Sequence, residues 1–344
     1  MKKEIKIGSI AIGGENPVII QSMANTDTKN TEETIKQIEM LESAGCELVR
    51  LATYDEESAR AIRAIKDRVR LPLVADVHFD YKIAIASMEA GADKVRINPG
   101  NIGAKHHIKY VADAAKAHGI PIRVGANSGS IGAKYRSREK SDALVESALE
   151  NVRYLEECGF YDIVIALKAS DVNASVAAYR KMNTLNDYPL HLGITEAGAY
   201  HSSIIKSSIG VGSLLLDDIG DTIRISMTGD PEQEIKAAQD ILQYTGKRSF
   251  HPEIIACPTC ARTNIDLIHL YEEVEKLVEN VRTPLKIAVM GCVVNGPGEA
   301  RDADIGIAGE RGAGIIFKKG KPVAKVKESE LLARFKEELN TMIG

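Results

Sequence analysis

Residues 43–50 read Ser-Ala-Gly-Cys-Glu-Leu-Val-Arg, and residues 89–96 repeat the pattern as Glu-Ala-Gly-Ala-Asp-Lys-Val-Arg. In both copies a helical pattern ends at a glycine, the residue favoured just beyond a helix C-terminus. A run typical of a buried strand follows, and an arginine lies five residues past the glycine. Residues 157–164 keep the glycine and the strand, with the basic residue delayed to Lys168. The chain therefore repeats a helix–strand unit.

The same unit extends on both sides of these copies. Strands are predicted at residues 17–23, 47–52, 73–77, 94–98, 120–124, 163–168, 190–195 and 222–227. Helices are predicted near 31–44, 55–68, 81–90, 105–118, 140–157, 171–185, 200–213 and 231–244. Strands that alternate with helices form a parallel sheet, and eight such units fit an α/β fold of the (β/α)8 TIM-barrel type. A doubly wound open sheet is the alternative, but the first strand is not followed by Gly-x-Gly-x-x-Gly.

The two ends of the chain follow other patterns. Residues 1–14 read as a hairpin that could plug the N-terminal end of the barrel. Residues 247–252 read as a linker or a loop at the barrel rim, and a small α+β domain follows. Its elements are expected at 263–280 (helix), 285–290 and 304–308 (strands), 313–326 (hairpin) and 328–341 (helix). We therefore expect a barrel over residues 1–244 and an α+β domain over residues 245–344.

Composition excludes several classes of protein. A net charge of −4 and the absence of Trp argue against nucleic-acid binding. No apolar run approaches the length of a membrane span, and no secretory signal is evident. Five cysteines, with Cys46 and Cys158 far from the others, argue against a disulfide framework. We expect a cytoplasmic enzyme in a reducing compartment.

Polar residues recur where the predicted barrel strands end, and active sites of TIM barrels gather at that face. Arg50, Arg96 and Arg123 come from three different strands and should converge there. A guanidinium group matches phosphate oxygens in bidentate geometry, so converging arginines predict a diphosphate ligand. Other polar residues at the same strand ends are Asp76, His78, Asn98, Asn127, Lys168, Thr195, Glu196 and Arg224.

The C-terminal domain carries a possible metal site. Cys257-Pro-Thr-Cys260 is followed by Cys292 in a glycine-rich loop, and Glu299 lies seven residues later. Three thiolates can hold three irons of a cubane cluster and leave the fourth open to substrate. Zinc is the alternative, although structural zinc prefers Cys and His, and no His lies near Cys292 in the sequence.

The chain resembles the 4-hydroxy-3-methylbut-2-en-1-yl diphosphate synthase family over nearly its whole length, in the shorter two-domain form. The resemblance is carried by Cys257-Pro-Thr-Cys260-Ala-Arg, by Met290-Gly-Cys-Val-Val-Asn-Gly-Pro-Gly-Glu-Ala and by Gly220-Asp-Thr-Ile-Arg-Ile-Ser. Further matching motifs are Ala75-Asp-Val-His, Arg96-Ile-Asn-Pro-Gly-Asn-Ile-Gly and Gly193-Ile-Thr-Glu-Ala-Gly.

The resemblance implies a barrel that binds 2-C-methyl-D-erythritol 2,4-cyclodiphosphate and a C-terminal domain with a 4Fe-4S cluster. It implies Cys257, Cys260 and Cys292 as thiolate ligands and Glu299 as the fourth ligand, which keeps one iron available for catalysis. It implies a flavodoxin or ferredoxin electron donor and a head-to-tail homodimer. The substrate-binding residues carried over from the family are Arg50, Arg96, Arg123, Asn127, Lys168, Lys206 and Arg248.

Two other classes of function remain open from the residues. One is a phosphate-binding barrel of the dihydropteroate-synthase kind with structural zinc in the small domain. The other is a non-enzymatic iron–sulfur assembly or sensor protein, which leaves the converging arginines without a purpose.

Overall fold

The computed structural model describes residues 2–98, 101–102, 105–135, 137–293, 298 and 300–343. The chain divides into two compact units, Met1–Arg248 and Ser249–Gly344. The division falls just after the helix that was expected to end the barrel.

The first unit is the expected barrel of parallel strands, and the prediction of eight strand–helix repeats is confirmed. Neighbouring strands follow the order β8-β7-β6-β5-β4-β3-β10-β9. The strands are β3 (Ile19–Met23), β4 (Leu48–Ala52), β5 (Leu73–Asp76), β6 (Lys94–Arg96), β7 (Ile122–Asn127), β8 (Ile163–Lys168), β9 (His191–Leu192) and β10 (Thr222–Ile223). The last two strands are shorter than the patterns predicted.

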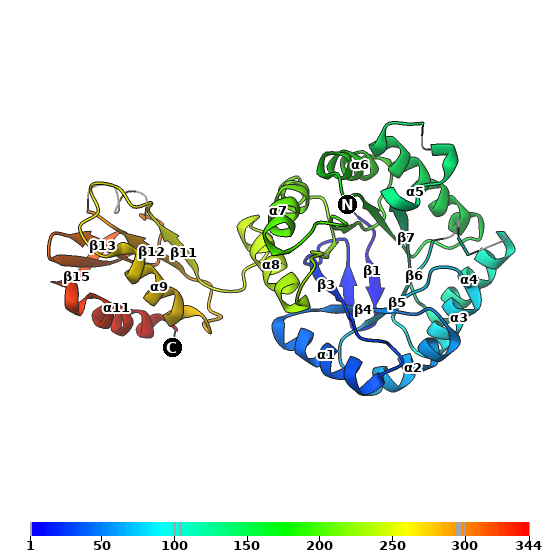
Figure 1. Ribbon diagram of the computed structural model, residues 1–344, viewed down its shortest axis with the longest axis horizontal. Helices are drawn as coiled ribbons and strands as arrows, with labels where there is room; N and C mark the ends of the chain where they lie inside the picture. Colours follow the sequence, from blue (N-terminus) through cyan, green and yellow to red (C-terminus); the bar gives the residue numbers. More distant parts are fainter. Residues whose placement is uncertain are drawn as a thin grey trace. The chain divides into compact units, whose positions relative to one another are not determined.

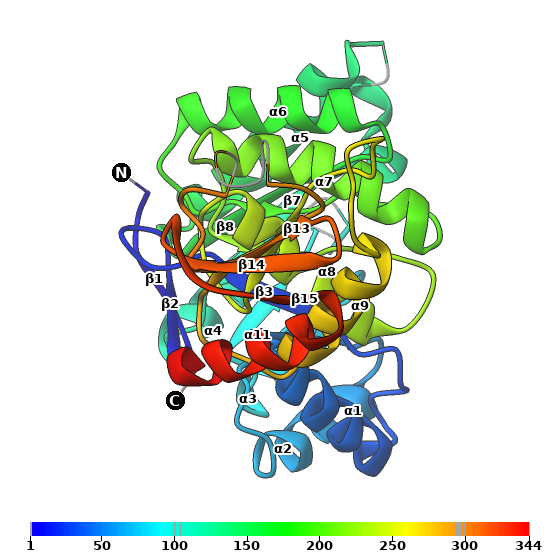
Figure 2. The ribbon, with the colours of Figure 1, turned by 90° about the vertical axis from the view of Figure 1, so that its left-hand side faces the viewer.

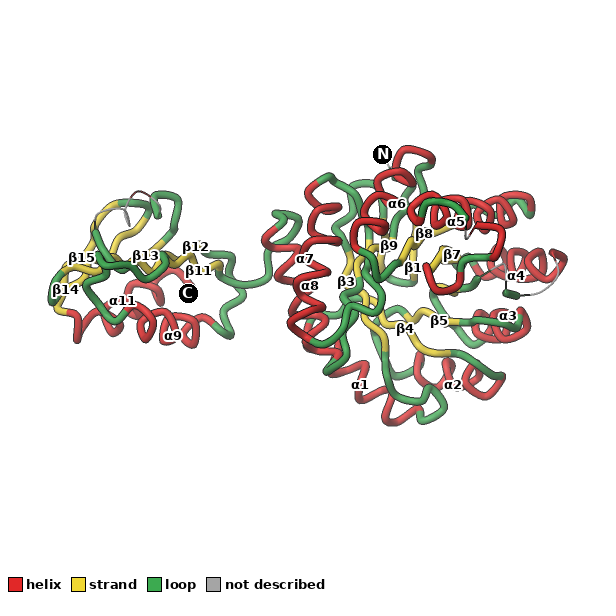
Figure 3. Tube along the Cα trace, turned by 45° about the horizontal axis from the view of Figure 1, so that its top comes forward, coloured by secondary structure: helices red, strands yellow, loops and turns green. Residues whose placement is uncertain are grey.

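The helices form a ring outside the strands (Figures 1 and 3). They are α1 (Thr31–Ala44), α2 (Glu56–Lys66), α3 (Tyr81–Glu89), α4 (Lys105–His118), α5 (Lys140–Glu157), α6 (Val172–Leu185), α7 (Tyr200–Leu216) and α8 (Pro231–Tyr244). Two short 3-10 turns, Ser128–Ser130 and Ala133–Tyr135, precede α5. Side chains such as Asp55 and Asp171 cap helix N-termini by accepting from backbone N–H groups. Gly45, with φ of 101°, takes the left-handed conformation that ends α1.

A tyrosine side chain completes the join between β8 and β9, where the strands themselves meet at a single bridge from Ile165 to Leu190. The hydroxyl of Tyr179, on α6, accepts a hydrogen bond from the backbone N–H of Leu167 at 2.9 Å. The same hydroxyl donates to the carbonyl of His191 at 2.5 Å. A fully buried phenol thus satisfies backbone groups that the short β9 leaves without a strand partner.

The N-terminal hairpin closes the lower end of the barrel, as its apolar residues suggested. Strands β1 (Ile5–Ile7) and β2 (Ile10–Ile12) pair in antiparallel register. Their isoleucines form one buried cluster with residues at the beginnings of barrel strands, namely Ile19, Leu48, Val74 and Val164. The opposite end, where the strands finish, remains available for a ligand.

The second unit is an α+β domain, in which two of the described helices cover one face of a five-stranded sheet. The sheet order is β11 (Glu253–Ala256), β12 (Lys286–Met290), β13 (Ile305–Glu310), β14 (Ala313–Lys318) and β15 (Lys321–Lys327). The first three strands are parallel, and β14 and β15 complete the sheet in antiparallel fashion. Strands β13, β14 and β15 are labelled in Figure 2. Helices α9 (Leu267–Val278) and α11 (Glu328–Ile343) pack on the isoleucines of β12 and β13 through one buried cluster. The sequence missed β11, which is short and only partly buried.

The plug hairpin provides a test of the fold. Ile7→Ala removes a fully buried side chain from the cluster and should lower the free energy of unfolding by about 2–4 kcal/mol. Lys6→Ala, on the same strand but exposed, should change it by less than about 0.5 kcal/mol. Urea denaturation followed by circular dichroism measures both, and equal effects of the two substitutions would contradict a packed plug.

Candidate functional site

The strand ends of the barrel surround a cavity lined mainly by basic and polar side chains. The lining residues are Arg50, Arg96, Arg123, Val124, Gly125, Asn127, Ala166, Lys168, Thr195, Arg224 and Ser226. Strand register explains why they meet, because Asp76 pairs with Arg96, and Arg96 with Arg123, across β5, β6 and β7. Asn127 and Lys168 are register partners in the same way on β7 and β8.

Asp76 holds two of the arginines in place. Its carboxylate lies 3.5 Å from Arg50 Nε and 3.0 Å from Arg96 Nη1, and all three side chains are largely buried. Burial alone would raise the pKa of Asp76, but the positive charges of Arg50 and Arg96 outweigh it and lower the pKa to about 2. Burial, opposed by Asp76, lowers the pKa of Arg50 to about 10.

His78 extends this network as a neutral side chain. Arg96 Nη1 lies 2.9 Å from His78 Nε2. Because a guanidinium can only donate, Nε2 accepts, and the ring proton lies on Nδ1. Burial and the positive charges of Arg96 and Arg50 lower the pKa of His78, in spite of Asp76. The imidazole therefore orients Arg96 without adding a charge.

A second carboxylate fixes Arg224 from the helix layer. Glu234 on α8 accepts from Arg224 Nη2 at 3.1 Å and from the backbone N–H of Met227 at 3.1 Å. It also accepts from the hydroxyl of Ser22 on β3 at 3.2 Å. Three donors on one buried carboxylate lock the orientation of Arg224 at the cavity.

Arg123 and Lys168 differ from the other cations that line the cavity because neither has a carboxylate within ion-pair distance in the described part of the chain. Arg123 is 2% exposed, and among the described residues its Nη1 has no hydrogen-bond partner. Lys168 fits beside Gly193 because a Cβ there would lie 2.8 Å from Lys168 Nζ. The missing side chain at Gly193 therefore makes the room that the ammonium group occupies.

The interior of the barrel consequently contains more basic than acidic groups. Among the described residues, six basic side chains point into it or line its cavity, namely Arg50, Lys94, Arg96, Arg123, Lys168 and Arg224. Two buried carboxylates, Asp76 and Glu234, contact this set. Buried charges without partners are costly, so the arrangement is suited to an anion that supplies the missing negative charge.

The structure does not bring every basic residue expected from the sequence to the cavity. Lys206 lies on α7 and is absent from the cavity lining. Arg248 lies at the opposite end of the barrel, where it donates to the carbonyl of Val18 at 2.9 Å and to Glu47 at 2.6 Å. Val18 and Glu47 immediately precede β3 and β4, so both lie at the lower face of the barrel. Arg248 reaches them because the chain leaves α8 at the same face.

Some residues at the cavity were missed or left out of the binding set. Arg224 and Thr195 were noted at strand ends but not assigned to the ligand, and Ser226 was not noted. Glu196, beside Thr195, is exposed, and its φ of 52° is a left-handed conformation uncommon for glutamate. The alternation of side chains along a strand predicts that Arg224 and Ser226 point the same way, since residues i and i+2 share a face. This pattern could have identified both as cavity residues.

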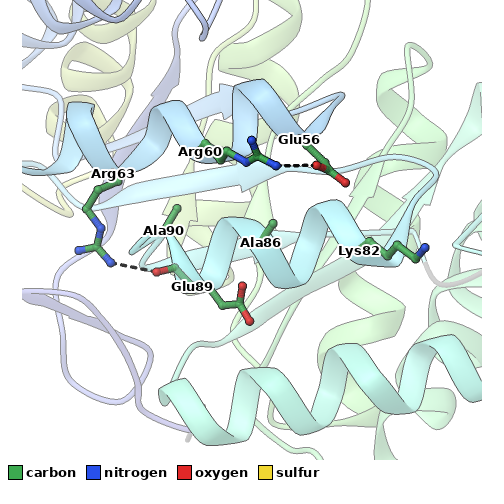
Figure 4. Close-up of a pocket in the computed structure, with 7 residues that line it drawn as sticks. All are labelled: Glu56, Arg60, Arg63, Lys82, Ala86, Glu89 and Ala90. Atoms are coloured by element: carbon green, nitrogen blue, oxygen red, sulfur yellow. Dashed lines mark hydrogen bonds and ion pairs between the residues drawn. The ribbon is translucent and has the colours of Figure 1, made fainter.

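A larger hollow lies outside the barrel between α2 and α3 (Figure 4). Two of its three cationic residues are already paired, with Arg60 donating to Glu56 at 2.8 Å and Arg63 donating to the carbonyl of Glu89 at 2.9 Å. The third, Lys82, is exposed to solvent. Paired or solvated surface cations do not need an anion to neutralise them, whereas the buried cations at the strand ends do, so the cavity there is the stronger candidate.

The second unit brings two of the three expected sulfur ligands to one sheet edge. Cys257 directly follows β11, and Cys292 follows β12 by two residues. These strands are parallel neighbours, with Ala256 opposite Val289, so their carboxyl ends meet at the same edge. The backbone N–H of Gly291 donates to Cys257 Sγ at 3.1 Å. Hydrogen bonds of this kind stabilise a thiolate and tune iron–sulfur clusters.

Cys260 completes the expected set of thiols on an exposed turn. Its backbone N–H donates to Thr263 Oγ1 at 3.2 Å, and its carbonyl accepts from the N–H of Thr263. The backbone N–H of Arg262, and then its side chain, lower the pKa of the Cys260 thiol. Glu299 lies outside the described residues. Among the described residues, no group of three His, Cys, Asp or Glu is closely enough arranged to hold a metal ion as it stands.

Comparisons with known proteins match both units. A family model described as GcpE TIM-barrel domain matches residues 2–239, and one described as GcpE protein C-terminal domain matches residues 253–341. The 4-hydroxy-3-methylbut-2-en-1-yl diphosphate synthase (flavodoxin) of Caldanaerobacter subterraneus subsp. tengcongensis is 53% identical over 346 residues, covering 100% of this chain and 98% of that protein. The protein of the same name from Fusobacterium nucleatum is 53% identical over 343 residues, covering 99% and 96%.

Solved structures resemble the chain at the level of fold. Yersinia pestis dihydropteroate synthase has a TM-score of 0.54 at 10% identity and covers 72% of this chain and 100% of its own. N-acetylneuraminic acid synthetase from Leptospira borgpetersenii has a TM-score of 0.51 at 14% identity, covering 72% and 90%. Separately, none of the helices in the described residues has the length and apolar character needed to cross a bilayer.

Asp76→Asn tests the charge balance of the cavity. Removal of the shared carboxylate leaves two largely buried guanidinium groups without a counter-charge, so the free energy of unfolding at neutral pH should fall by about 3–5 kcal/mol. Asp113→Asn, which removes an exposed carboxylate paired with Lys109, should change it by less than about 0.5 kcal/mol.

The effect of Asp76→Asn should also depend on pH. Because the folded-state pKa of about 2 lies below the unfolded value of about 3.9, the Asp76 carboxylate stabilises the protein above the unfolded value. That contribution is lost as the pH falls through the folded value. Urea denaturation at a series of pH values should therefore show the wild type and the variant converging in acid, whereas a constant difference would contradict the assignment.

Proposed function

The chain belongs to the GcpE family of 4-hydroxy-3-methylbut-2-en-1-yl diphosphate synthases, and on this premise we propose that it reduces 2-C-methyl-D-erythritol 2,4-cyclodiphosphate. The product is 4-hydroxy-3-methylbut-2-enyl diphosphate. The conversion opens the cyclic diphosphate at carbon, removes one hydroxyl as water and takes up two electrons and two protons, counted on the neutral acids. The relatives carry this activity in their names.

The observation that carries the proposal is the excess of basic groups at the strand ends of the barrel. A cyclic diphosphate is a dianion, and Arg123 and Lys168 lack carboxylate partners in the described residues that could compete for it. Guanidinium forks suit its oxygens, and Asn127 adds a polar group beside Lys168. We assign Arg50, Arg96, Arg123, Asn127, Lys168 and Arg224 to substrate binding and leave out Lys206 and Arg248.

The same side chains contribute to the chemical step. When the ring opens, one phosphate oxygen leaves carbon and gains negative charge. Arginines that Asp76 and Glu234 already hold in place can stabilise that charge without rearranging. Asp76 and Glu234 act here as positioning residues, since each holds a guanidinium group rather than the substrate.

Cys257, Cys260 and Cys292 are proposed to hold a 4Fe-4S cluster with Glu299. The donor set fits, because Cys257 and Cys292 follow adjacent parallel strands and the Gly291 N–H already points at a sulfur. Three thiolates and one carboxylate leave the oxygen-ligated iron the easiest to expose. When bound, such a cluster supplies single electrons and a Lewis-acidic iron. Flavodoxin, which the relatives' names contain, or ferredoxin would provide the electrons. Both the cluster and its thiolates suit the reducing cytoplasm.

The exit of the chain from the barrel supports a head-to-tail homodimer. Arg248 is fixed at the lower face by Val18 and Glu47, whereas the cavity lies at the upper face. A fully extended chain from Arg248 to Cys257 spans at most about 30 Å. A path along α8, about 21 Å, and over the helix layer, about 10 Å, is roughly as long, so a site within one chain would need this segment fully stretched. We propose that the cysteines of one chain serve the barrel of its partner.

Metal analysis distinguishes the proposed cluster from a zinc-containing barrel of the dihydropteroate-synthase kind. Anaerobically purified or reconstituted protein should contain about four irons and four sulfides per chain. Cys292→Ala should lose most of this iron, whereas Cys158→Ala, a cysteine of the barrel unit, should retain it. About one zinc per chain and no sulfide would contradict the cluster.

Mixed dimers test the arrangement of the two units. Arg123→Ala disables the barrel cavity and Cys292→Ala disables the cluster site, so each variant alone should be inactive. If sites form between chains, random mixing should restore about a quarter of the wild-type activity, because half the dimers are mixed and each has one intact site. Proven mixed dimers without activity would show that each site is built within one chain.

A further inference from the structure

A second layer of basic and polar residues lies beneath the cavity, inside the barrel. Lys94 precedes Arg96 by two residues on β6, and Gln21 precedes Met23 by two on β3. His191, on β9, likewise precedes Gly193 by two. Residues i and i+2 of a strand share a face, so each of these residues points inward below a residue of the upper end.

The contacts within this layer leave polar nitrogen atoms unmatched. Lys94 is 0% exposed, and its Nζ lies 3.4 Å from Gln21 Oε1. His191 is equally buried and shares a hydrogen bond of 2.8 Å between its Nδ1 and Thr222 Oγ1. Across the part of the chain that the structure describes, Gln21 Nε2 and His191 Nε2 have no hydrogen-bond partner. The layer contains bases with little to stabilise their charged forms.

The charged groups that face these bases are themselves cations. Burial, and then Arg123 and Arg50, lower the pKa of Lys94. Burial, followed by the arginines of the cavity, lowers the pKa of Lys168, and burial with Lys168, Arg123, Lys94 and Arg50 lowers that of His191. Arginine side chains stay protonated in proteins. The repulsion between these cations can therefore be reduced only if Lys94, Lys168 or His191 loses its proton. We call Lys94, Lys168 and His191 the buried bases.

We propose that binding of the cyclic diphosphate is coupled to uptake of protons by the buried bases, with Lys94 as a principal acceptor. This inference rests on the proposed function and adds to it. Without ligand, six basic side chains face two carboxylates among the residues that the structure describes, and neutral lysines would relieve the imbalance. A bound dianion supplies the missing negative charge and favours the protonated lysines.

Proton uptake has a consequence for affinity and for the reaction. Each proton taken up makes the dissociation constant rise about tenfold per pH unit, between the pKa values of the free and bound states. The ligand itself does not titrate near neutrality, since each of its phosphorus atoms carries one strongly acidic proton. The reaction consumes protons. Lys168, which lines the cavity, would already be protonated once the complex has formed.

Calorimetry of the full-length protein with the cyclodiphosphate, without reductant, tests the proposal. Titrations at one neutral pH in buffers of different ionisation enthalpy count the protons bound. The wild type should take up about half a proton or more per ligand. Lys94→Met should take up clearly less and should still bind, because Lys94 lies below the cavity lining. Lys109→Met, an exposed lysine on α4 paired with Asp113, should match the wild type.

A stability measurement shows whether the variant remains folded. The pKa of Lys94 is lower in the folded than in the unfolded protein, so the unfolded state binds more protons and stability rises with pH. Lys94→Met should therefore raise the melting temperature at neutral pH, with a gain that shrinks toward the ordinary lysine pKa.

The outcomes separate the two proposals. Normal binding by the wild type without proton uptake would overturn the inference and leave the proposed function intact. Equal uptake by the wild type and Lys94→Met would overturn the role of Lys94. A wild-type protein that does not bind the cyclodiphosphate at all would contradict the proposed function itself.

Discussion

The main constraint on this structure is an excess of buried positive charge inside the barrel. Arg50, Arg96 and Arg224 are held by Asp76 and Glu234, but Arg123 and Lys168 have no carboxylate within ion-pair distance in the described residues. A parallel barrel imposes this crowding, because eight strand ends converge on one small mouth and their inward residues meet there. Packing of the plug and the carboxylates of Asp76 and Glu234 offset part of this repulsion. The remaining positive charge is suited to a compact anion such as a diphosphate.

The sequence predicted the barrel because periodicity is strong where buried strands alternate with amphipathic helices. It also placed Arg50, Arg96 and Arg123 together, since strand-end position alone determines which face of a barrel a residue reaches. Lys94 was missed because a lysine in a short strand was not read as an inward residue, although its spacing from Arg96 required it. The hydrogen bonds of Tyr179 could not be predicted from the sequence. They are needed because β9 is short and meets β8 at a single bridge, which the sequence pattern does not indicate.

Residues assigned by family resemblance alone do not line the cavity, whereas residues that also lie at strand ends do. The cavity includes Asn127 and Lys168, which are the last residues of β7 and β8. It does not include Lys206 or Arg248, which lie in or after helices. A chain that leaves a barrel helix does so at the lower face, so the position of Arg248 follows from connectivity alone. In the second unit, parallel pairing of β11 and β12 explains why cysteines distant in sequence belong to one sheet edge.

The central claim is that the barrel interior is built to be completed by a dianion. Thermal unfolding of the full-length protein measures it directly, with the cyclodiphosphate compared against the uncharged polyol 2-C-methylerythritol at equal concentration. The diphosphate should raise the melting temperature by several degrees, since a ligand that binds only the folded state stabilises it. The polyol should leave the melting temperature unchanged. A diphosphate that gives no rise, or a polyol that gives an equal one, would contradict the claim.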